Sequence, residues 1–418
     1  MAGVADGSAL RTVEEHLAAI LETVTVLPSE HLPVREALGR TLSADVLAAE
    51  RIPVFDNSGM DGFAVRRSDV ERATPETPVV LEVVADIPAG SAEDPAIGPG
   101  QAARIMTGAA VPTDADAVVP VEHTLEGFAA QVGDHVTIRT APVGAAHVRK
   151  AGEDIEIGDV VVQAGTLLGA YQASAVNAAG VAFVDVAAAP RVAIISTGTE
   201  LRSPGELLDR GEIPESNSML LAGLVESAGG MVAIQRKITD DPEALHAVVD
   251  GLADIDVVLM SGGVSAGAYE PVRQAFGATG QMQFVQVAMQ PGKPQGFGAL
   301  PDGTLLFGFP GNPVSVAVSF EMFARPALLA MQGRTELHRP RIRIPAAEGW
   351  RTPKGRRQHL PATIDRSDPA RWTVRPAHGG GSGSHMAGGL ALAEAIAIVP
   401  AEVEAVEAGD LIDVMLVS

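Results

Sequence analysis

The sequence VVLMSGGVSAG at residues 257–267 places an apolar run directly before a turn of glycine and serine, and LLFGFPGNPVSVAV at residues 305–318 repeats this pattern. A third glycine turn, QPGKPQG at 290–296, lies between them. Glycine lets backbone N–H groups approach a ligand closely, hydroxyls add donors, and a helix N-terminus adds partial positive charge. Together with Lys293, the three turns predict a site for a large ligand with several anionic groups.

Strands and helices alternate on both sides of these turns. The runs RVAIIS (191–196) and MVAIQRKI (231–238) read as strands, as do VVLM and LLFGF within the quoted stretches. Helices are expected over 216–230, 241–253 and 314–331. This alternation predicts a parallel, doubly wound sheet. Ligands of such sheets bind outside the carboxyl ends of the strands, where the glycine turns lie.

The rest of the chain has a different pattern. Residues 11–27 have helical apolar spacing and end at Pro28, whereas residues 51–157 carry short apolar runs between proline and glycine clusters. From residue 339 onward the pattern is again that of strands. The predicted fold is therefore a multidomain α/β protein: a doubly wound parallel-sheet domain, a mostly β insert domain and a C-terminal β-barrel or sandwich.

Composition excludes several classes of function. The chain of 418 residues has no cysteine, which excludes thiol catalysis, disulfides and iron–sulfur clusters. A formal net charge of −22 argues against a nucleic-acid partner, because no bulk positive field exists to displace counterions. No uncharged apolar stretch of 18 residues and no basic, apolar signal pattern is present. We expect a cytoplasmic protein with no membrane association.

Positive charge gathers at residues 334–357, which hold eight of the 30 lysines and arginines. A basic segment in an acidic protein can focus an anionic substrate into a cleft. A solvated strand surface explains the same run equally well, so both interpretations stay open.

Carboxylates also follow the predicted strands. Glu200 lies in STGTEL (196–201), and Asp240 and Asp241 follow MVAIQRKIT. If they converge on one rim, their oxygens can hold a hard cation such as Mg²⁺. Simpler explanations exist for each: Asp241 precedes Pro242 as a helix N-cap would, and Glu200 fits the first turn of a helix.

Three earlier motifs carry polar groups. They are FDNSGMDGFAV (55–65), RIMTGAAVP (104–112) and HVRKAGEDI (147–155). Each has a local explanation as well, since Asp and Asn before glycine make tight turns and the third can be a surface ion-pair loop.

Taken together and in order, these motifs resemble those of the MoeA family of molybdopterin molybdenumtransferases, over nearly the whole chain. The resemblance implies insertion of molybdate into adenylylated molybdopterin with Mg²⁺ and release of AMP, in molybdenum cofactor biosynthesis. It also implies a homodimer, with a MogA-like adenylyltransferase and molybdoenzyme chaperones as further partners. The domains it implies are an α/β molybdopterin-binding domain (1–28 and 190–338), a linker or dimer domain (29–50 and 158–189), a β-rich domain (51–157) and a C-terminal β-barrel (339–418).

The resemblance also implies roles for single residues. Asp61 and Thr107 match positions that face the site from the partner subunit, and Glu200 and Asp240 match acidic positions for magnesium or pyrophosphate chemistry. The catalytic positions that it implies are Asp61, Thr107, Asp154, Glu200, Asp240 and Lys293. The substrate-binding positions that it implies are Arg149, Ser261, Gly262, Gly263, Ser265, Pro310, Gly311, Pro313 and Ser384.

The chain departs from the family pattern in one region. The family often has lysine where this chain has Gln290, acidic residues where it has Ala268, Tyr269 and Glu270, and arginine where it has Pro361. These departures concern the molybdate end of the site more than the pterin end. Two alternatives stay open: a molybdopterin adenylyltransferase or CinA-like pyrophosphatase that uses the same α/β domain, and a non-catalytic scaffold as in gephyrin.

Overall fold

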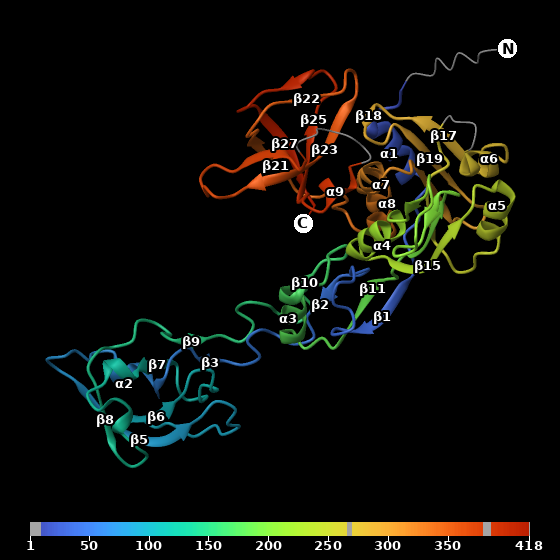
Figure 1. Cartoon of the computed structure of the whole chain (residues 1–418). Helices are drawn as coiled ribbons and strands as arrows, with labels where there is room; N and C mark the ends of the chain where they lie inside the picture. Colours follow the sequence, from blue (N-terminus) through green and yellow to red (C-terminus); the bar gives the residue numbers. More distant parts are fainter. Residues whose placement is uncertain (1–9, 266–269, 379–385, 418) are drawn as a thin grey trace, which may run out of the picture.

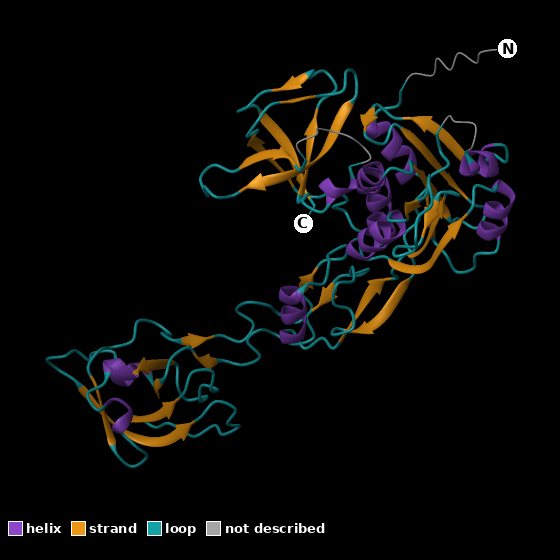
Figure 2. Cartoon of the chain, viewed as in Figure 1, coloured by secondary structure: helices purple, strands orange, loops and turns teal. Residues whose placement is uncertain are grey.

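The chain is elongated, with the α/β unit and the C-terminal strands at one end and a β-rich segment at the other (Figure 1). The computed structural model describes residues 10–265, 270–378 and 386–417. A small segment that contains α3 (Ala170–Ala178) joins the two ends. Figure 2 shows that helices concentrate in the α/β unit, whereas the β-rich segment and the C-terminal part are mostly strand.

The sheet of the α/β unit has six strands in the order β15-β12-β16-β20-β19-β17. Their bounds are β12 Arg191–Thr197, β15 Met231–Ile238, β16 Val257–Ser261, β17 Met282–Gln286, β19 Pro294–Ala299 and β20 Leu305–Phe309. The first four strands in this order are parallel, as predicted. The last two pair antiparallel, so the sheet is mixed. The reason is local: β17 and β19 form a hairpin, and the QPGKP turn is part of its connection.

Helices cover both faces of this sheet. They are α4 Asn217–Ser227, α5 Pro242–Asp250, α6 Pro271–Gly277, α7 Pro313–Ser319 and α8 Arg325–Met331, with a π-helical turn over Phe320–Ala324 between the last two. Residues Pro313–Met331 make a helix long and apolar enough to cross a membrane, but 89% of it is buried inside the protein, as expected of a core helix.

The N-terminal helix α1 (Val13–Leu21) packs on α8 and the π-helical turn, and its Val13 and Ile20 belong to the main core. It is shorter than the predicted 11–27. The four residues after Glu22 are Thr23, Val24, Thr25 and Val26, and such β-branched residues lose rotamer freedom in a helix. The chain leaves the helix there, and the N–H of Leu27 donates to the carbonyl of Met331.

The β-rich segment contains a five-stranded sheet with the order β7-β4-β6-β5-β8. Its strands are β4 Gly62–Val65, β5 Val79–Ile87, β6 Gln101–Ile105, β7 Ala117–Pro120 and β8 His135–Ile138. A two-stranded ladder of β3 (Asn57–Ser58) and β9 (Val148–Arg149) lies beside it. The joining segment pairs β1 (Ser29–Pro33) with β11 (Phe183–Ala187), and β2 (Val46–Leu47) with β10 (Val160–Val162).

The C-terminal strands are β21 Arg341–Pro345, β23 Arg357–Asp365, β24 Thr373–Pro376, β25 Ala395–Val399 and β27 Leu411–Leu416. A bridge between Ala346 and Val374 connects the two ends of this sheet, so it closes on itself around its own apolar core. The sheet also takes in β18 (Met289–Gln290) from the α/β unit, which pairs with β23. The middle glycine turn is therefore shared between the two parts of the chain.

Candidate functional site

A cavity of about 820 Å³ lies at the carboxyl ends of β12, β16 and β20, where all three glycine turns meet. Ten of the predicted residues line it: Glu200, Asp240, Ser261, Gly262, Gly263, Ser265, Lys293, Pro310, Gly311 and Pro313. The topology explains this convergence, because the carboxyl ends of neighbouring parallel strands share one edge of the sheet.

The first turn follows β16 and requires glycine for packing. Gly262 has φ of +95°, and a Cβ there would lie 2.7 Å from the carbonyl oxygen of Thr197. Gly263 has φ of +67°, and its Cβ would lie 2.8 Å from the ring of Pro271 at the start of α6. Two N–H groups of this turn are engaged within the protein: that of Gly262 donates to the carbonyl of Phe309, and that of Ser265 to the carboxylate of Glu270.

The acidic rim consists of Glu200 and Asp240. Asp240 accepts hydrogen bonds from the N–H and the hydroxyl of Thr199, at 3.0 and 3.1 Å. Glu200 lies in the turn that leads into the short strand β13 (Leu201–Arg202), so the alternative that placed it in a helix is wrong. Asp241 is the N-cap of α5 and accepts from the N–H groups of Glu243 and Ala244. Within the described ranges no group of three potential metal ligands occurs.

The middle turn brings positive charge to the cavity. Its Lys293 lines the cavity. Arg356, the residue before β23, also lines the cavity because β23 pairs with β18 of the middle turn. The amide of Gln295 holds the turn by donating to the carbonyl of Gly292 and the hydroxyl of Ser319, at 2.6 and 2.7 Å. Gln290 also lines the cavity, and its Oε1 is buried without a hydrogen-bond partner in the described part of the chain.

The remaining charges of the basic segment are mostly in ion pairs. Arg339 makes a bidentate contact with the buried Glu321, at 2.8 and 2.9 Å. Arg357 pairs with Glu14, Arg343 with Asp413, and Lys354 with Glu404. Of the basic segment, Arg356 therefore lines the cavity, whereas these four residues form ion pairs within the protein.

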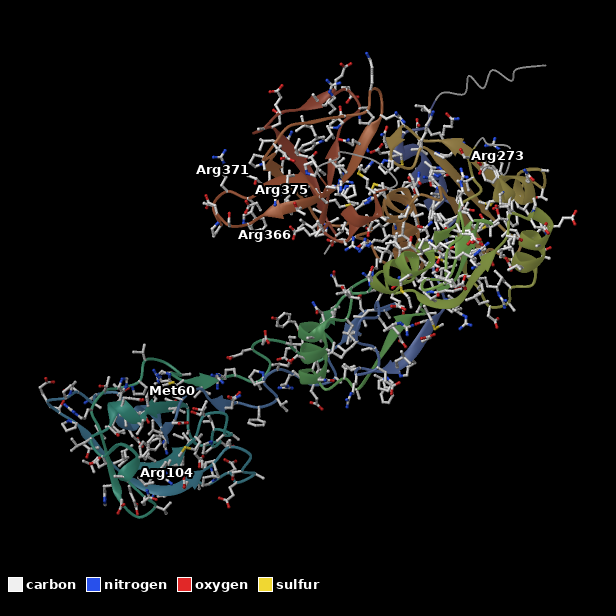
Figure 3. The ribbon with its side chains drawn as sticks, in the orientation of Figure 1. Met60, Arg104, Arg273, Arg366, Arg371 and Arg375 are labelled. Carbon is white, nitrogen blue, oxygen red and sulfur yellow. The ribbon has the colours of Figure 1, made fainter. Side chains whose placement is uncertain are left out.

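Four predicted residues lie on the β-rich segment, and none of them lines this cavity. Asp61 precedes β4, and its Oδ1 accepts two hydrogen bonds from Thr107, which follows β6. These bonds, first that of the hydroxyl and then that of the N–H, hold the pKa of Asp61 below its usual value. Figure 3 labels Met60, the residue before Asp61, on this segment and well away from the α/β unit.

Arg149 and Asp154 complete this second group. Arg149 ends β9 opposite Asn57, and its Nε lies 3.6 Å from where a Cβ on Gly59 would stand. The N–H of Asp154 donates to the carbonyl of Ile52, and both side chains are exposed. The structure thus separates the predicted residues into a cavity group and a distal group. Ser384 lies outside the described residues, as do Ala268 and Tyr269.

Sequence reasoning missed Glu215 and Asn217, assigned no site role to Glu270, and considered Arg356 only within the basic segment 334–357 and as a charge that compensates for Gln290 and Pro361. The cavity is lined by Glu215, Asn217, Glu270 and Arg356 alike. Glu215 and Asn217 come from the segment ESN at the start of α4, which reads as an ordinary helix start. Glu270 lies shortly after the SGGVSAG turn and accepts from the N–H of Ser265. The four carboxylates that line the cavity exceed its two basic side chains, Lys293 and Arg356.

Family models match three successive parts of the chain. Residues 11–180 match the MoeA N-terminal region (domain I and II), residues 193–330 match a probable molybdopterin binding domain, and residues 343–417 match the MoeA C-terminal region (domain IV). The chain belongs to the MoeA family. This confirms the resemblance predicted from the sequence motifs.

Individual relatives match this chain over nearly its whole length. The chain is 40% identical to molybdopterin molybdenumtransferase 2 of Mycobacterium tuberculosis H37Rv, over 97% of this chain and 99% of the relative. It is 32% identical to molybdopterin molybdenumtransferase of Staphylococcus aureus N315, over 97% and 95%. The crystal structure of the molybdopterin biosynthesis moeA protein of Pyrococcus horikoshii OT3 superposes with a TM-score of 0.81 at 27% identity, covering 98% of this chain and all of that one. These matches confirm the predicted fold class.

Proposed function

We propose that this chain is a molybdopterin molybdenumtransferase, which inserts molybdate into adenylylated molybdopterin with Mg²⁺ and releases AMP. Its membership of the MoeA family and the names of its full-length relatives support a transferase of molybdenum cofactor biosynthesis. The observation that carries the proposal is the cavity, in which three glycine turns, an acidic rim and two basic side chains converge. A ligand with several phosphates and a bound cation matches this arrangement of charges.

The acidic rim fits Mg²⁺. Glu200 and Asp240 offer carboxylate oxygens, and Mg²⁺ is usually bound by one or two carboxylates together with substrate phosphates and water. When bound, the ion would neutralise charge on the phosphoanhydride of the substrate.

Lys293 and Arg356 also line the cavity and would bind the anionic groups of the substrate. Molybdate is a tetrahedral dianion, for which charge-assisted hydrogen bonds from such side chains are suited. A molybdate oxygen can attack the phosphorus of the molybdopterin phosphate, so that the P–O bond to AMP breaks, AMP leaves and no side-chain nucleophile is required. The contribution of the protein is then mainly to position the reactants and to stabilise charge.

The distal group of predicted residues suggests that the site is shared between two subunits. Asp61, Thr107, Arg149 and Asp154 lie on the β-rich segment of the elongated chain, apart from its own cavity. A symmetric homodimer would let the β-rich segment of one subunit cover the cavity of the other. We propose that the site is composite in this way. The cytoplasmic location, the MogA-like adenylyltransferase and the chaperone partners stay predictions.

One assay tests the proposal. Purified protein is mixed with adenylylated molybdopterin, Mg²⁺ and molybdate, and AMP release is followed with and without molybdate. If the proposal is correct, AMP is released only when molybdate is present. Release that is independent of molybdate would instead identify a pyrophosphatase, and intact pterin binding without turnover would identify a scaffold.

A further inference from the structure

One wall of the cavity is made of residues whose side chains each donate a hydrogen bond to another group of the protein. We call Thr197, Asn217 and Ser261 the acceptor wall. The hydroxyl of Ser261 donates to the Oγ of Ser196 at 3.2 Å, and that of Thr197 to the carbonyl of Ser261 at 3.4 Å. The amide of Asn217 donates to the carbonyl of Gly311 at 2.7 Å. All three side chains line the cavity and are at most 9% exposed.

Glu215 fixes the direction of the hydrogen bond from Ser261. Its Oε1 accepts from the Oγ of Ser196 and from the N–H of Ser218, both at 2.9 Å, and its Oε2 accepts from the hydroxyl of Ser218. A carboxylate accepts and does not donate, so the single proton of Ser196 is directed to Glu215. Ser196 must then accept from Ser261, and the oxygen of Ser261 is left with lone pairs.

The amide of Asn217 is oriented in the same sense. A backbone carbonyl only accepts hydrogen bonds, so the contact with Gly311 places Nδ2 on that side and leaves Oδ1 as an acceptor. This Oδ1 is buried and has no hydrogen-bond partner in the part of the chain that the structure describes. A buried polar atom without a partner is uncommon in folded proteins and calls for a specific explanation.

We propose that Glu215 is a positioning residue that acts through Ser196 to present Ser261 as an acceptor, so that the acceptor wall binds the N–H edge of an amino-substituted heteroaromatic ring. Phosphate oxygens are acceptors at neutral pH and do not pair with such a wall. The proposed substrate contains two rings with amino and N–H donors, pterin and adenine, and this inference rests on that proposed function. Its phosphates and molybdate would lie toward Lys293 and Arg356.

The variant Ser196→Ala tests the inference. Alanine removes the oxygen that accepts from Ser261, while Glu215 keeps its hydrogen bonds from the N–H and hydroxyl of Ser218 at the start of α4. The hydroxyl of Ser261 then has no acceptor at this position and donates into the cavity. Binding is measured by titration calorimetry with three probes: AMP, unsubstituted pterin and inorganic pyrophosphate.

We expect the dissociation constant of one ring-bearing probe to rise about tenfold in Ser196→Ala, which is typical when a buried polar group loses its partner. Pyrophosphate should bind as tightly as to the wild type or more tightly. A rise for pterin alone assigns the wall to the pterin, and a rise for AMP alone assigns it to adenine. Equal weakening of all three probes indicates a purely structural role and overturns the inference, as do unchanged constants for all three or no binding of either ring to the wild type.

Ser227→Ala is the matched control. Ser227 lies on α4, donates to the carbonyl of Leu224 and does not line the cavity. It should leave all three constants unchanged. Molybdate-dependent AMP release by the wild type is measured in parallel. Release without the change of preference in Ser196→Ala refutes only this inference, whereas the change of preference without AMP release refutes only the proposed function.

Discussion

Asp61 accepts two hydrogen bonds from a single residue, Thr107, whose N–H and hydroxyl both lie 2.6 Å from its Oδ1. The two residues are 46 positions apart in the chain, and the pairing of β4 with β6 brings them together. Because both bonds favour the charged form, they hold the pKa of Asp61 below its usual value.

We predict that Thr107→Val raises this pKa, since valine keeps the N–H but removes the hydroxyl that contributes most. If Asp61 acts as an ionised carboxylate, the acid limb of the profile of kcat/KM against pH moves to higher pH. Thr113→Val is the control, because Thr113 donates to Asp94 in the same two ways in the same segment. A profile that moves equally in both variants would contradict a role for Asp61.

A second prediction concerns Mg²⁺ at the acidic rim. Asp240→Asn removes a charge while Thr199 can still donate to the remaining carbonyl oxygen. We expect the Mg²⁺ concentration that gives half-maximal AMP release to rise by at least about tenfold, because a carboxylate is a far stronger ligand than an amide for a hard cation.

Asp241→Asn is the neighbouring control. Asp241 caps α5, and asparagine is an equally good N-cap, so both stability and Mg²⁺ dependence should be retained. If Asp240→Asn shows the Mg²⁺ dependence of the wild type, the ion is held elsewhere.

The convergence of the cavity residues could be predicted from sequence because it follows from one rule. STGTEL, SGGVSAG and GFPGNP each come directly after a strand, and parallel strands present these ends at a common edge. The rule does not cover Arg356, which reaches the cavity only through the pairing of β18 with β23. The local sequence of β18 and of β23 does not predict that the α/β unit and the C-terminal strands pair here.

Other features depend on contacts between distant parts of the chain, which the local sequence does not predict. The start of α4 contains Glu215, whose role in the cavity depends on Ser196 at the end of another strand. The antiparallel part of the sheet depends on the hairpin of β17 and β19, and these two strands were not among those predicted from the sequence. The N-cap role of Asp241 was predictable, because a cap is set by the residues that directly follow it.

The third prediction tests the composite site. Asp61→Ala disables the distal group and Lys293→Ala the cavity group, so each variant alone should be inactive. In a dimer that contains one copy of each, one of the two sites is formed from intact halves. Random exchange of subunits should therefore restore about a quarter of the wild-type AMP release, if subunits pair with C2 symmetry. Mixing without exchange, at low temperature, should restore none, and activity that stays absent after verified exchange places both groups in one chain.

The fourth prediction concerns Gln290, where the family often has lysine. Gln290→Lys adds a cation beside Lys293 at the oxyanion end of the cavity. We expect KM for molybdate to fall several-fold and KM for adenylylated molybdopterin to change little. Gln131→Lys adds the same charge on the exposed surface of the β-rich segment and should change neither value. If the KM for molybdate is unchanged in Gln290→Lys, molybdate does not bind at this end of the cavity.

The last prediction concerns stability at acid pH. His16 on α1 and His359 on β23 are at most 2% exposed, and burial lowers the pKa of His16 to about 4 and that of His359 to about 3. Unfolding restores the ordinary pKa of about 6.5. Between these values the unfolded chain binds protons that the folded chain does not, so the free energy of unfolding must fall as pH decreases from about 6.5 to 4.

For His16 alone the loss of stability reaches about 3 kcal/mol when pH has fallen from about 6.5 to the folded pKa of about 4. The variants His16→Gln and His359→Gln cannot take up this proton, so each should lower the slope of stability against pH in this window, even if its stability at pH 8 is reduced. Denaturant midpoints measured from pH 8 to 4.5 give the slope, and His135→Gln, an exposed histidine on β8, should keep that of the wild type. Slopes in both variants as steep as in the wild type would mean that other groups, such as the ion-paired carboxylate of Glu14, dominate acid unfolding.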